Sequence, residues 1–162
     1  MTSKLNPGTV IYVMRSFPII YKHFGVYVGD DKVVHFAPNR SGKYYTQMSD
    51  DETIIHEIDI NDFIGNSERC FTQNFPQNQK ELELILKVKH KSKSFIAKIM
   101  ADFDRSGYQF FSQEEVVNRA RNEIGRKGYN VLWNNCEHFA VWCKTNVVYS
   151  NQVEHLYNLL LF

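Results

Sequence analysis

The N-terminal part of the chain alternates short apolar runs with polar turn residues, a pattern typical of a meander of β-strands. Four runs rich in β-branched or aromatic residues carry this pattern, at positions 9–14, 24–28, 33–36 and 54–60. Gly29-Asp30-Asp31 separates the second run from the third and predicts a hairpin. The polar stretches 38–52 and 65–80 predict loops. The pattern therefore predicts an antiparallel sheet in the N-terminal part.

Residues 82–88 alternate apolar and charged side chains, which predicts a further strand even though Ile85 interrupts the alternation. The segment from Lys87 to Lys93 is basic. We interpret it as a solvated strand edge whose lysines discourage aggregation. Contact with lipid phosphates is the alternative interpretation.

Helical spacing appears later in the chain. Ser112, followed by Glu115, has the capping-box pattern of a helix start. Apolar residues at helical spacing continue from Val116 to Ile124, and Gly125 then predicts the end of the helix.

The last helix is predicted to begin at Asn134 or Asn135, with Glu137 placed to complete a capping box with Asn134. One side of this helix carries apolar and thiol side chains: Trp133, Cys136, Ala140 and Cys143. The predicted fold class is α+β, with an N-terminal antiparallel sheet and a C-terminal helix that carries Cys136.

Composition limits the domain organisation and the location. A chain of 162 residues with 43% hydrophobic residues suits one compact domain over residues 1–162. A net charge of +1 gives no reason to expect nucleic-acid binding. Three cysteines without a secretory leader indicate a cytoplasmic protein rather than a disulfide framework. The apolar segment 156–162 is too short to span a bilayer. We interpret it as packing on the core or as the start of a membrane anchor.

Cys136 is the best candidate for a reactive side chain. A thiol reacts as its thiolate, and an ordinary pKa of about 8.5 leaves little thiolate at neutral pH. A helix N-terminus favours negative charge by about 0.3–1 kcal/mol, and a nearby imidazolium is expected to supply the rest. Cys143 fits a buried apolar residue better, and Cys70 lies in a polar stretch.

Two of the six histidines are candidates for the partner of this thiol. His23 and His35 flank the predicted hairpin in apolar sequence, where a buried imidazole must be hydrogen-bonded. His138 follows Cys136 by two residues, so on a helix it points elsewhere and is predicted to form a structural hydrogen bond. The others are interpreted as solvated: His56, His90 and His155.

The register of the hairpin decides whether His23 and His35 share a face of the sheet. A loop with an even number of residues places them on opposite faces. A three-residue loop pairs His35 with Gly25, which lies on the same face as His23. If the two histidines work together, we expect an odd-count loop or a bulge with the same effect.

Nucleophile, base and orienting residue then follow the logic of a catalytic triad. His23 would take the proton of Cys136, and His35 would hold the His23 ring and fix its tautomer. A zinc site formed by these residues with His138 matches no standard spacing. Neither a metal nor another cofactor is predicted.

Two blocks of the chain resemble the lecithin:retinol acyltransferase family, and within it the phospholipase A and acyltransferase proteins, or HRAS-like suppressors. The first block contains Asn6-Pro7-Gly8, Tyr21 to Asp30 and Val33 to Pro38. The second contains Asn135-Cys136-Glu137-His138-Phe139, followed by Ser150-Asn151-Gln152-Val153.

This resemblance implies a circularly permuted papain-like (NlpC-type) domain with Cys136 as nucleophile, His23 as base and His35 as third triad member. It implies cleavage of a glycerophospholipid acyl ester through a cysteine thioester, with transfer of the acyl group to water or an amine. The expected partner is a phospholipid or membrane surface. Backbone N–H groups at the helix start would hold the oxyanion, with Asn134 and Asn135 in a supporting or capping role.

The same signature, an H-box with an Asn-Cys motif, occurs in picornaviral proteins. The alternative is therefore a catalytically silent interaction module, viral or cellular, that acts on protein partners. A thiol peptidase or amidase on the same fold is a third hypothesis. The complete set of Cys136, His23 and His35 favours the enzyme.

Overall fold

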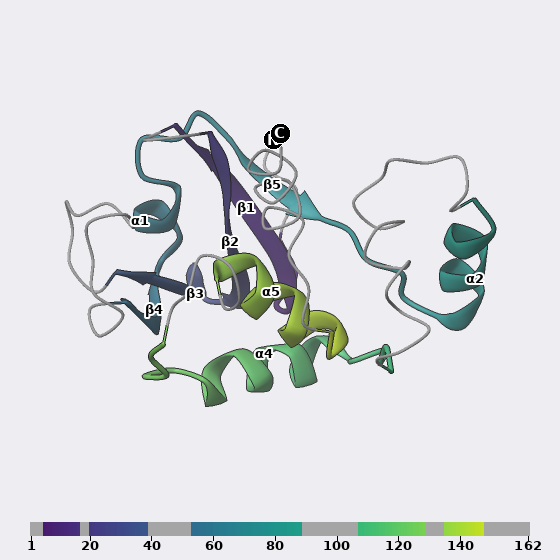
Figure 1. Cartoon of the computed structure of the whole chain (residues 1–162). Coiled ribbons are helices and arrows are strands. Elements are labelled where there is room, and N and C mark those ends of the chain that lie inside the picture. Colours follow the sequence, from purple (N-terminus) through teal and green to yellow (C-terminus); the bar gives the residue numbers. More distant parts are fainter. Residues whose placement is uncertain (1–4, 17–19, 39–52, 89–106, 129–134, 148–162) are drawn as a thin grey trace, which may run out of the picture.

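The computed structural model describes residues 5–16, 20–38, 53–88, 107–128 and 135–147. Within these ranges the centre of the molecule is an antiparallel five-stranded sheet with strand order β4-β3-β2-β1-β5. Its strands are β1 (Thr9–Arg15), β2 (Tyr21–Gly29), β3 (Lys32–Pro38), β4 (Thr53–Asp59) and β5 (Cys70–Gln73). Figure 1 shows the sheet crossed by the helices of the C-terminal half.

The helices assigned in the same ranges are α1 (Ile60–Ile64), α2 (Gln79–Val88), α4 (Gln113–Asn122) and α5 (Cys136–Thr145). Helix α5 packs on β2 and β3, and α4 packs against α5 and β2. Helix α1 contacts β3 and β4, while α2 lies apart from the sheet (Figure 1). The α+β class predicted from the sequence is confirmed.

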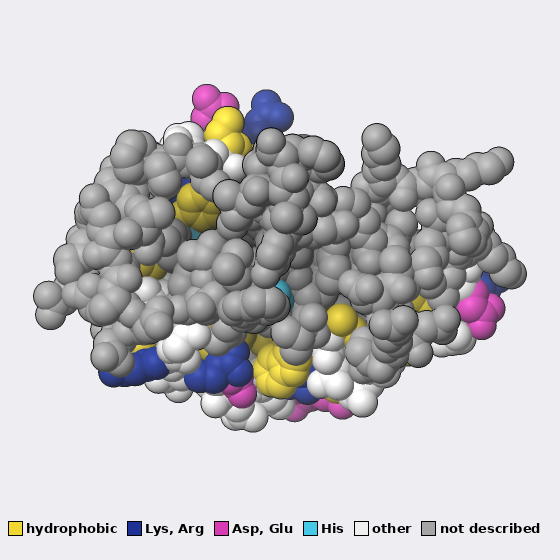
Figure 2. Space-filling view, viewed as in Figure 1, with side chains coloured by type: hydrophobic (Ala, Val, Ile, Leu, Met, Phe, Trp, Pro, Cys, Tyr) yellow, Lys and Arg dark blue, Asp and Glu magenta, His cyan; other side chains and the backbone are white. Residues whose placement is uncertain are grey.

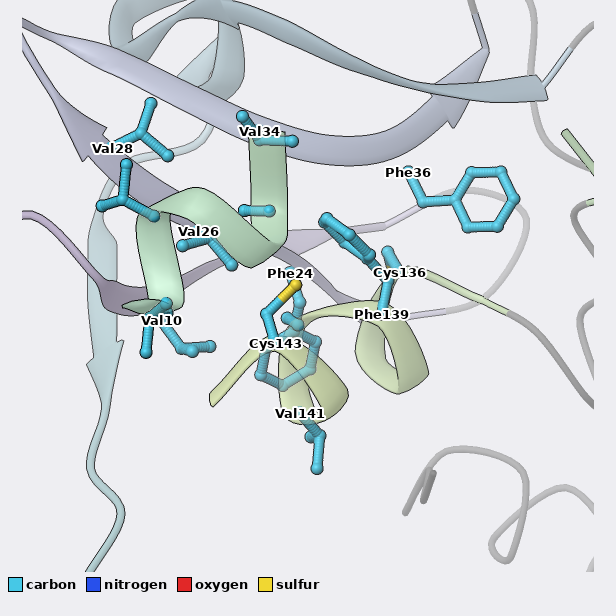
Figure 3. Close-up of a cluster of buried hydrophobic side chains, with 14 of the residues drawn as sticks. Val10, Phe24, Val26, Val28, Val34, Phe36, Cys136, Phe139, Val141 and Cys143 are labelled. Carbon is cyan, nitrogen blue, oxygen red and sulfur yellow. The ribbon is translucent and has the colours of Figure 1, made fainter. Parts of the chain in front are cut away.

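Strand alternation divides the core between the two faces of the sheet. Val10 and Val26 belong to a large apolar cluster shared with α4 and α5 (Figure 3). Their neighbours Ile11 and Tyr27 belong to a smaller cluster on the other face, with Phe63 of α1. A residue's position in a strand therefore decides which helices it can contact.

The hairpin between β2 and β3 has the bulge that the histidine argument required. Asp30 and Asp31 form its turn, both with positive φ, as in the tight hairpin turns that match strand twist. The register shifts between Tyr27 and Gly29, so that His35 pairs with Gly25. The same-face placement predicted for His23 and His35 is confirmed.

Pairing between β2 and β3 ends at the Gly25–His35 pair. Beyond it β2 stays paired with β1 as far as Tyr21, and β3 stays paired with β4 as far as Pro38. The pairing between β2 and β3 therefore stops two residues from His23, while each of these strands keeps its other neighbour.

The segment 82–88 is helical, so the strand predicted there was wrong. It forms most of α2, and Asn78 precedes the helix and accepts a hydrogen bond from the backbone N–H of Glu81 at 3.0 Å. Leu82 is buried whereas Leu84 is 63% exposed, so the alternating leucines do not share one buried face. Leu, Glu and Lys are strong helix formers, and the cap decides between the two structures. The side chains of the basic segment from Lys87 lie outside those described.

Part of the predicted loop 65–80 was also assigned wrongly. Residues 70–73 form β5, which pairs with the outer edge of β1. Its mixed, partly exposed side chains have the character of an edge strand. Pairing with an open neighbour, rather than its own apolar pattern, makes this segment a strand.

The predicted start of α4 is confirmed. The Ser112 hydroxyl accepts from the backbone N–H of Glu115, and the Glu115 carboxylate accepts from the backbone N–H of Ser112. The helix ends at Asn122, slightly before the predicted end at Ile124. In Figure 2, Lys and Arg side chains gather along the lower edge, near the turn after α4. Across the described ranges, no helix combines the length and apolarity needed to cross a bilayer.

Candidate functional site

Cys136 lies in the first turn of helix α5, as predicted, and is the first residue of that helix. The Asn135 side chain caps the helix by accepting hydrogen bonds from the backbone N–H groups of Glu137 and His138, at 2.9 and 3.1 Å. The backbone N–H of Asn135 donates in return to His138 Nδ1 at 3.3 Å. His138 is therefore the structural hydrogen-bonding residue that was predicted.

The capping box itself differs from the predicted one. Its members are Asn135 and His138, not Asn134 and Glu137. His138 occupies the third helical position, and its Nδ1 accepts a hydrogen bond as a Glu carboxylate would. Asn134 lies outside the described residues.

The Cys136 side chain lies between α5 and the sheet. It is 1% exposed and belongs to the large apolar cluster, on the side toward Phe36 (Figure 3). Its thiol donates a hydrogen bond to the carbonyl oxygen of Lys22, with an S–O distance of 3.9 Å. Lys22 precedes His23 in β2, so the sulfur lies against the strand that carries the candidate base.

Burial dominates the ionisation of this thiol. It raises the pKa of Cys136 to about 12, although the backbone N–H groups of Phe24, Glu137 and Cys136 lower that pKa. This direction is opposite to the thiolate expected from the helix N-terminus together with a nearby imidazolium. Removing the thiolate from water costs more free energy than the helix dipole and the amide groups contribute to its stabilisation.

Three imidazoles form a row across β2, β3 and β4. His23 Nε2 lies 2.8 Å from His35 Nδ1, and His35 Nε2 lies 3.0 Å from His56 Nε2. His56 Nδ1 in turn bonds the carbonyl oxygen of Ile54 at 3.1 Å. The structure thus joins His23 to His35 as predicted, and it adds a histidine that had been interpreted as solvated.

The register explains this row. His35 and His56 are direct partners between β3 and β4. His35 pairs with Gly25 on β2, and His23 is two residues away on the same face. The interpretation of His56 as solvated was wrong, because β4 pairs with β3 in the register that places His56 beside His35.

Phe63 of α1 packs on the two buried imidazoles. Its ring centroid lies 5.3 Å from that of His23 and 5.7 Å from that of His35. Gly25 makes this approach feasible, since a Cβ there would lie 2.9 Å from the Phe63 ring and 2.6 Å from Val33 Cγ1. Arg15 holds α1 in place by donating to the carbonyl oxygens of Phe63 and Ile64.

Burial keeps His23 and His35 uncharged. Burial, together with a smaller effect of the Arg15 charge, lowers the pKa of His23 to about 3. Burial also lowers the pKa of His35 well below its usual value, and a cation there would also be repelled by Arg15 and by any positive charge on His23 or His56. At neutral pH both rings are therefore neutral, and each carries its proton on one nitrogen only.

Cys136 and His23 approach β2 from opposite faces. Phe24 shares the α5-side cluster with Cys136, whereas the His23 ring packs on Phe63 of α1. Lys22 and His23 lie in the part of β2 that is no longer paired with β3. The thiol thus contacts the backbone beside His23 where the pairing between β2 and β3 has stopped.

The structure describes some of the remaining predicted residues. Cys143 is buried in the apolar cluster as predicted, and Cys70 is half-buried in β5. His90 and His155 lie outside the described residues, as does Trp133. Among the residues that are described, no group of three or more His, Cys, Asp or Glu side chains is arranged to hold a metal ion.

The similarity of this chain to known proteins extends over most of its length. Residues 3–149 match the family model described as lecithin retinol acyltransferase. This chain belongs to the lecithin retinol acyltransferase family.

Among curated relatives, the human lecithin retinol acyltransferase is 29% identical over 163 residues, covering 93% of this chain and 59% of that protein. The rat protein of the same name is 25% identical over 150 residues, covering 91% and 57%. Protein LEAD-SENSITIVE 1 of Arabidopsis thaliana is 28% identical over 170 residues, covering 88% and 58%. The chain thus spans somewhat less than three fifths of the length of these relatives. The family predicted from the motifs is confirmed.

His56 is the site residue that sequence reasoning missed. A signal was present, because His56 alternates with Ile54 and Ile58 and so shares their face of the strand. A histidine in phase with apolar residues is a candidate for burial. Its partner became visible only once β4 was paired with β3.

Proposed function

We propose that this chain is a thiol-dependent phospholipase A and acyltransferase with Cys136 as nucleophile. The observation that carries the proposal is that the Cys136 thiol contacts the carbonyl of Lys22, next to His23, whose ring is hydrogen-bonded to His35. Membership of an acyltransferase family supports this assignment. The same considerations, with the chain order of histidines before cysteine, support a circularly permuted papain-like arrangement.

In the proposed reaction, His23 takes the proton of Cys136 as the sulfur attacks the acyl carbon of a glycerophospholipid ester. The C–O bond then breaks, and His23 returns the proton to the departing glycerol oxygen. Water or an amine next attacks the thioester, His23 takes its proton, and the proton passes to the departing sulfur. Atoms and charge balance without a cofactor.

Both partners are neutral before substrate arrives, because burial raises the pKa of Cys136 to about 12 and lowers that of His23 to about 3. The proposed proton transfer is therefore concerted with attack, as in serine hydrolases, rather than preceded by a stable thiolate–imidazolium pair. The sulfur and the His23 ring lie on opposite faces of β2, so in this proposal they meet where β2 is paired with β1 but no longer with β3.

The oxyanion of the tetrahedral intermediate would be held by backbone N–H groups at the start of α5, including that of Cys136. Asn135 supports them by fixing the helix start. A supporting role for Asn134 remains part of the proposal. The acyl donor implies action at a membrane surface from the cytoplasmic side.

A catalytically silent interaction module is the second candidate, and the burial of Cys136 favours it. A thiol that is 1% exposed must be uncovered before an acyl ester can reach it. In the silent module the cap, the histidine row and the thiol would serve folding, and the biological effect would come from protein partners.

Incubation with phosphatidylcholine vesicles, followed by mass spectrometry of the α5 peptide, separates the two candidates. We expect an acyl adduct on Cys136 and release of lysophospholipid. Cys136→Ala should abolish both, and Cys143→Ala, which changes a buried thiol of the same helix, should retain both. Equal product release by wild type and Cys136→Ala, with no adduct, would contradict the enzyme. A biological effect that survives Cys136→Ala would then support the module.

A further inference from the structure

We propose that His56 is a positioning residue that acts through His35 to hold the proton of His23 on Nε2, which leaves Nδ1 as the basic nitrogen. The evidence is the unbroken chain of hydrogen bonds from the Ile54 carbonyl through His56 and His35 to His23. The tautomer assignment stands on this geometry. Its consequence for catalysis rests on the proposed function.

The carbonyl oxygen of Ile54 sets the direction of the chain. A carbonyl oxygen only accepts hydrogen bonds, so the bond at 3.1 Å requires a proton on His56 Nδ1. A neutral imidazole carries one N–H, so His56 Nε2 is then an acceptor. His35 must supply the proton in the 3.0 Å bond between the two Nε2 atoms.

The same logic passes the direction on to His23. With its proton on Nε2, neutral His35 offers Nδ1 as an acceptor. The 2.8 Å bond between His35 Nδ1 and His23 Nε2 is therefore donated by His23. His23 then holds its proton on Nε2, and Nδ1 carries the lone pair that can take a thiol proton.

Burial fixes the direction of the hydrogen bonds at the inner two rings, those of His23 and His35. His23 is 3% exposed and His35 is 6% exposed, so neither is expected to gain a second proton that would release the constraint. Phe63 packs on both rings and limits their rotation. A change at the outermost member of the row is therefore expected to reverse the bond pattern.

His56 is that outermost member, and it is less buried than the other two. A side chain at position 56 that can only donate would reverse both inner bonds, so that His23 would carry its proton on Nδ1 and lose its basic nitrogen there. A side chain that can accept from His35 should leave the direction unchanged.

The proposal is tested with ¹⁵N-histidine-labelled protein, in which long-range ¹H–¹⁵N correlation spectra report which ring nitrogen carries the proton. In wild type we expect the His23 proton on Nε2 and the His56 proton on Nδ1. His56→Gln, whose amide oxygen can accept, should leave His23 unchanged. His56→Lys, which only donates, should move the His23 proton to Nδ1, and His56→Leu should give a mixture.

Turnover of phosphatidylcholine supplies the second readout. We expect His56→Leu and His56→Lys to lower kcat by about 100-fold or more, as wrong tautomers do in other triads, with little change in KM. His56→Gln should restore most of kcat. A purely structural role would instead lower the amount of folded protein and leave the His23 tautomer unchanged.

Two results would overturn the proposal: a wild-type His23 with its proton on Nδ1, or the same His23 tautomer in wild type and His56→Lys. The wild-type spectrum decides the first even if a variant fails to fold. An enzyme without turnover, but with the expected spectra, would remove the proposed function and leave the tautomer assignment intact.

Discussion

Single residues at this site are governed by burial more than by local charge. The helix N-terminus favours a Cys136 thiolate by about 0.3–1 kcal/mol. Burial raises the pKa of this thiol from 9.0 to about 12, which corresponds to roughly 4 kcal/mol in the opposite direction. The larger effect wins, so the resting site is neutral. Any reactivity must then come from a base that acts during attack, which makes the protonation of His23 important.

Asn135 is the residue whose removal should cost the helix most directly. Its side chain caps α5 at two backbone N–H groups. Asn135→Ala should lower the free energy of unfolding by about 0.5–2 kcal/mol, measured by chemical denaturation. Asn135→Ser keeps a capping oxygen and should recover most of the loss. Equal stability of the Ala and Ser variants would show that the cap contributes little.

Pairs of elements place the imidazoles. The bulge in the β2–β3 hairpin sets the face of His35, the pairing of β3 with β4 brings in His56, and α1 covers the row with Phe63. None of these elements holds the row alone. Gly25 lies at the point where these elements pack together. Val33 and Phe63 both occupy the space that a side chain at this position would need.

Gly25→Ala should therefore lower the free energy of unfolding by about 1–3 kcal/mol, the range found when a packed core is overfilled. It should also broaden or shift the ring resonances of His23 and His35. Val33→Ala removes the nearer of the two clashing groups, at 2.6 Å. The double variant should lose less stability than the two single losses combined. Simple additivity would contradict the proposed clash.

At the scale of the whole molecule, the buried neutral histidines should make the stability of the folded protein sensitive to acid. The folded pKa of His23 is lowered from 6.5 to about 3 by burial and neighbouring charge, and that of His35 is lowered too. The unfolded chain therefore binds more protons below about pH 6.5 than the folded chain does. Their stabilising effect is present above that pH and is lost progressively as the pH falls towards 3.

Denaturant unfolding at a series of pH values should show this directly. Between pH 6.5 and 4.5 each such histidine contributes a slope of up to about 1.4 kcal/mol per pH unit. His23→Gln should have a shallower slope by up to that amount, whatever its absolute stability. His90→Gln, at one of the positions interpreted as solvated from the sequence, serves as the comparison and should keep the wild-type slope. A wild-type stability that is flat across this range would contradict the burial of neutral imidazoles.

Local pattern alone determined several features of this protein. The apolar runs of β1 to β4, the hairpin at Gly29 to Asp31 and the Ser112 cap depend on neighbouring residues in the chain, so the sequence is enough to predict them. The length of the hairpin loop was left open. The same is true of a helix that begins at Cys136. The family followed from two compact motifs.

Tertiary structure decided the rest, because the deciding contacts join residues far apart in the chain. Residues 70–73 became a strand by pairing with β1. The helix over 82–88 is the exception, because the Asn78 cap that favours it is a local contact that its apolar pattern did not indicate. His56 joined the site through its pairing with His35 on β3. The pKa of Cys136 is high because sheet and helix together exclude water. The spacing of residues along a chain shows the period of a helix or strand. Desolvation of a side chain, and the direction of a chain of hydrogen bonds, depend instead on what packs around each group.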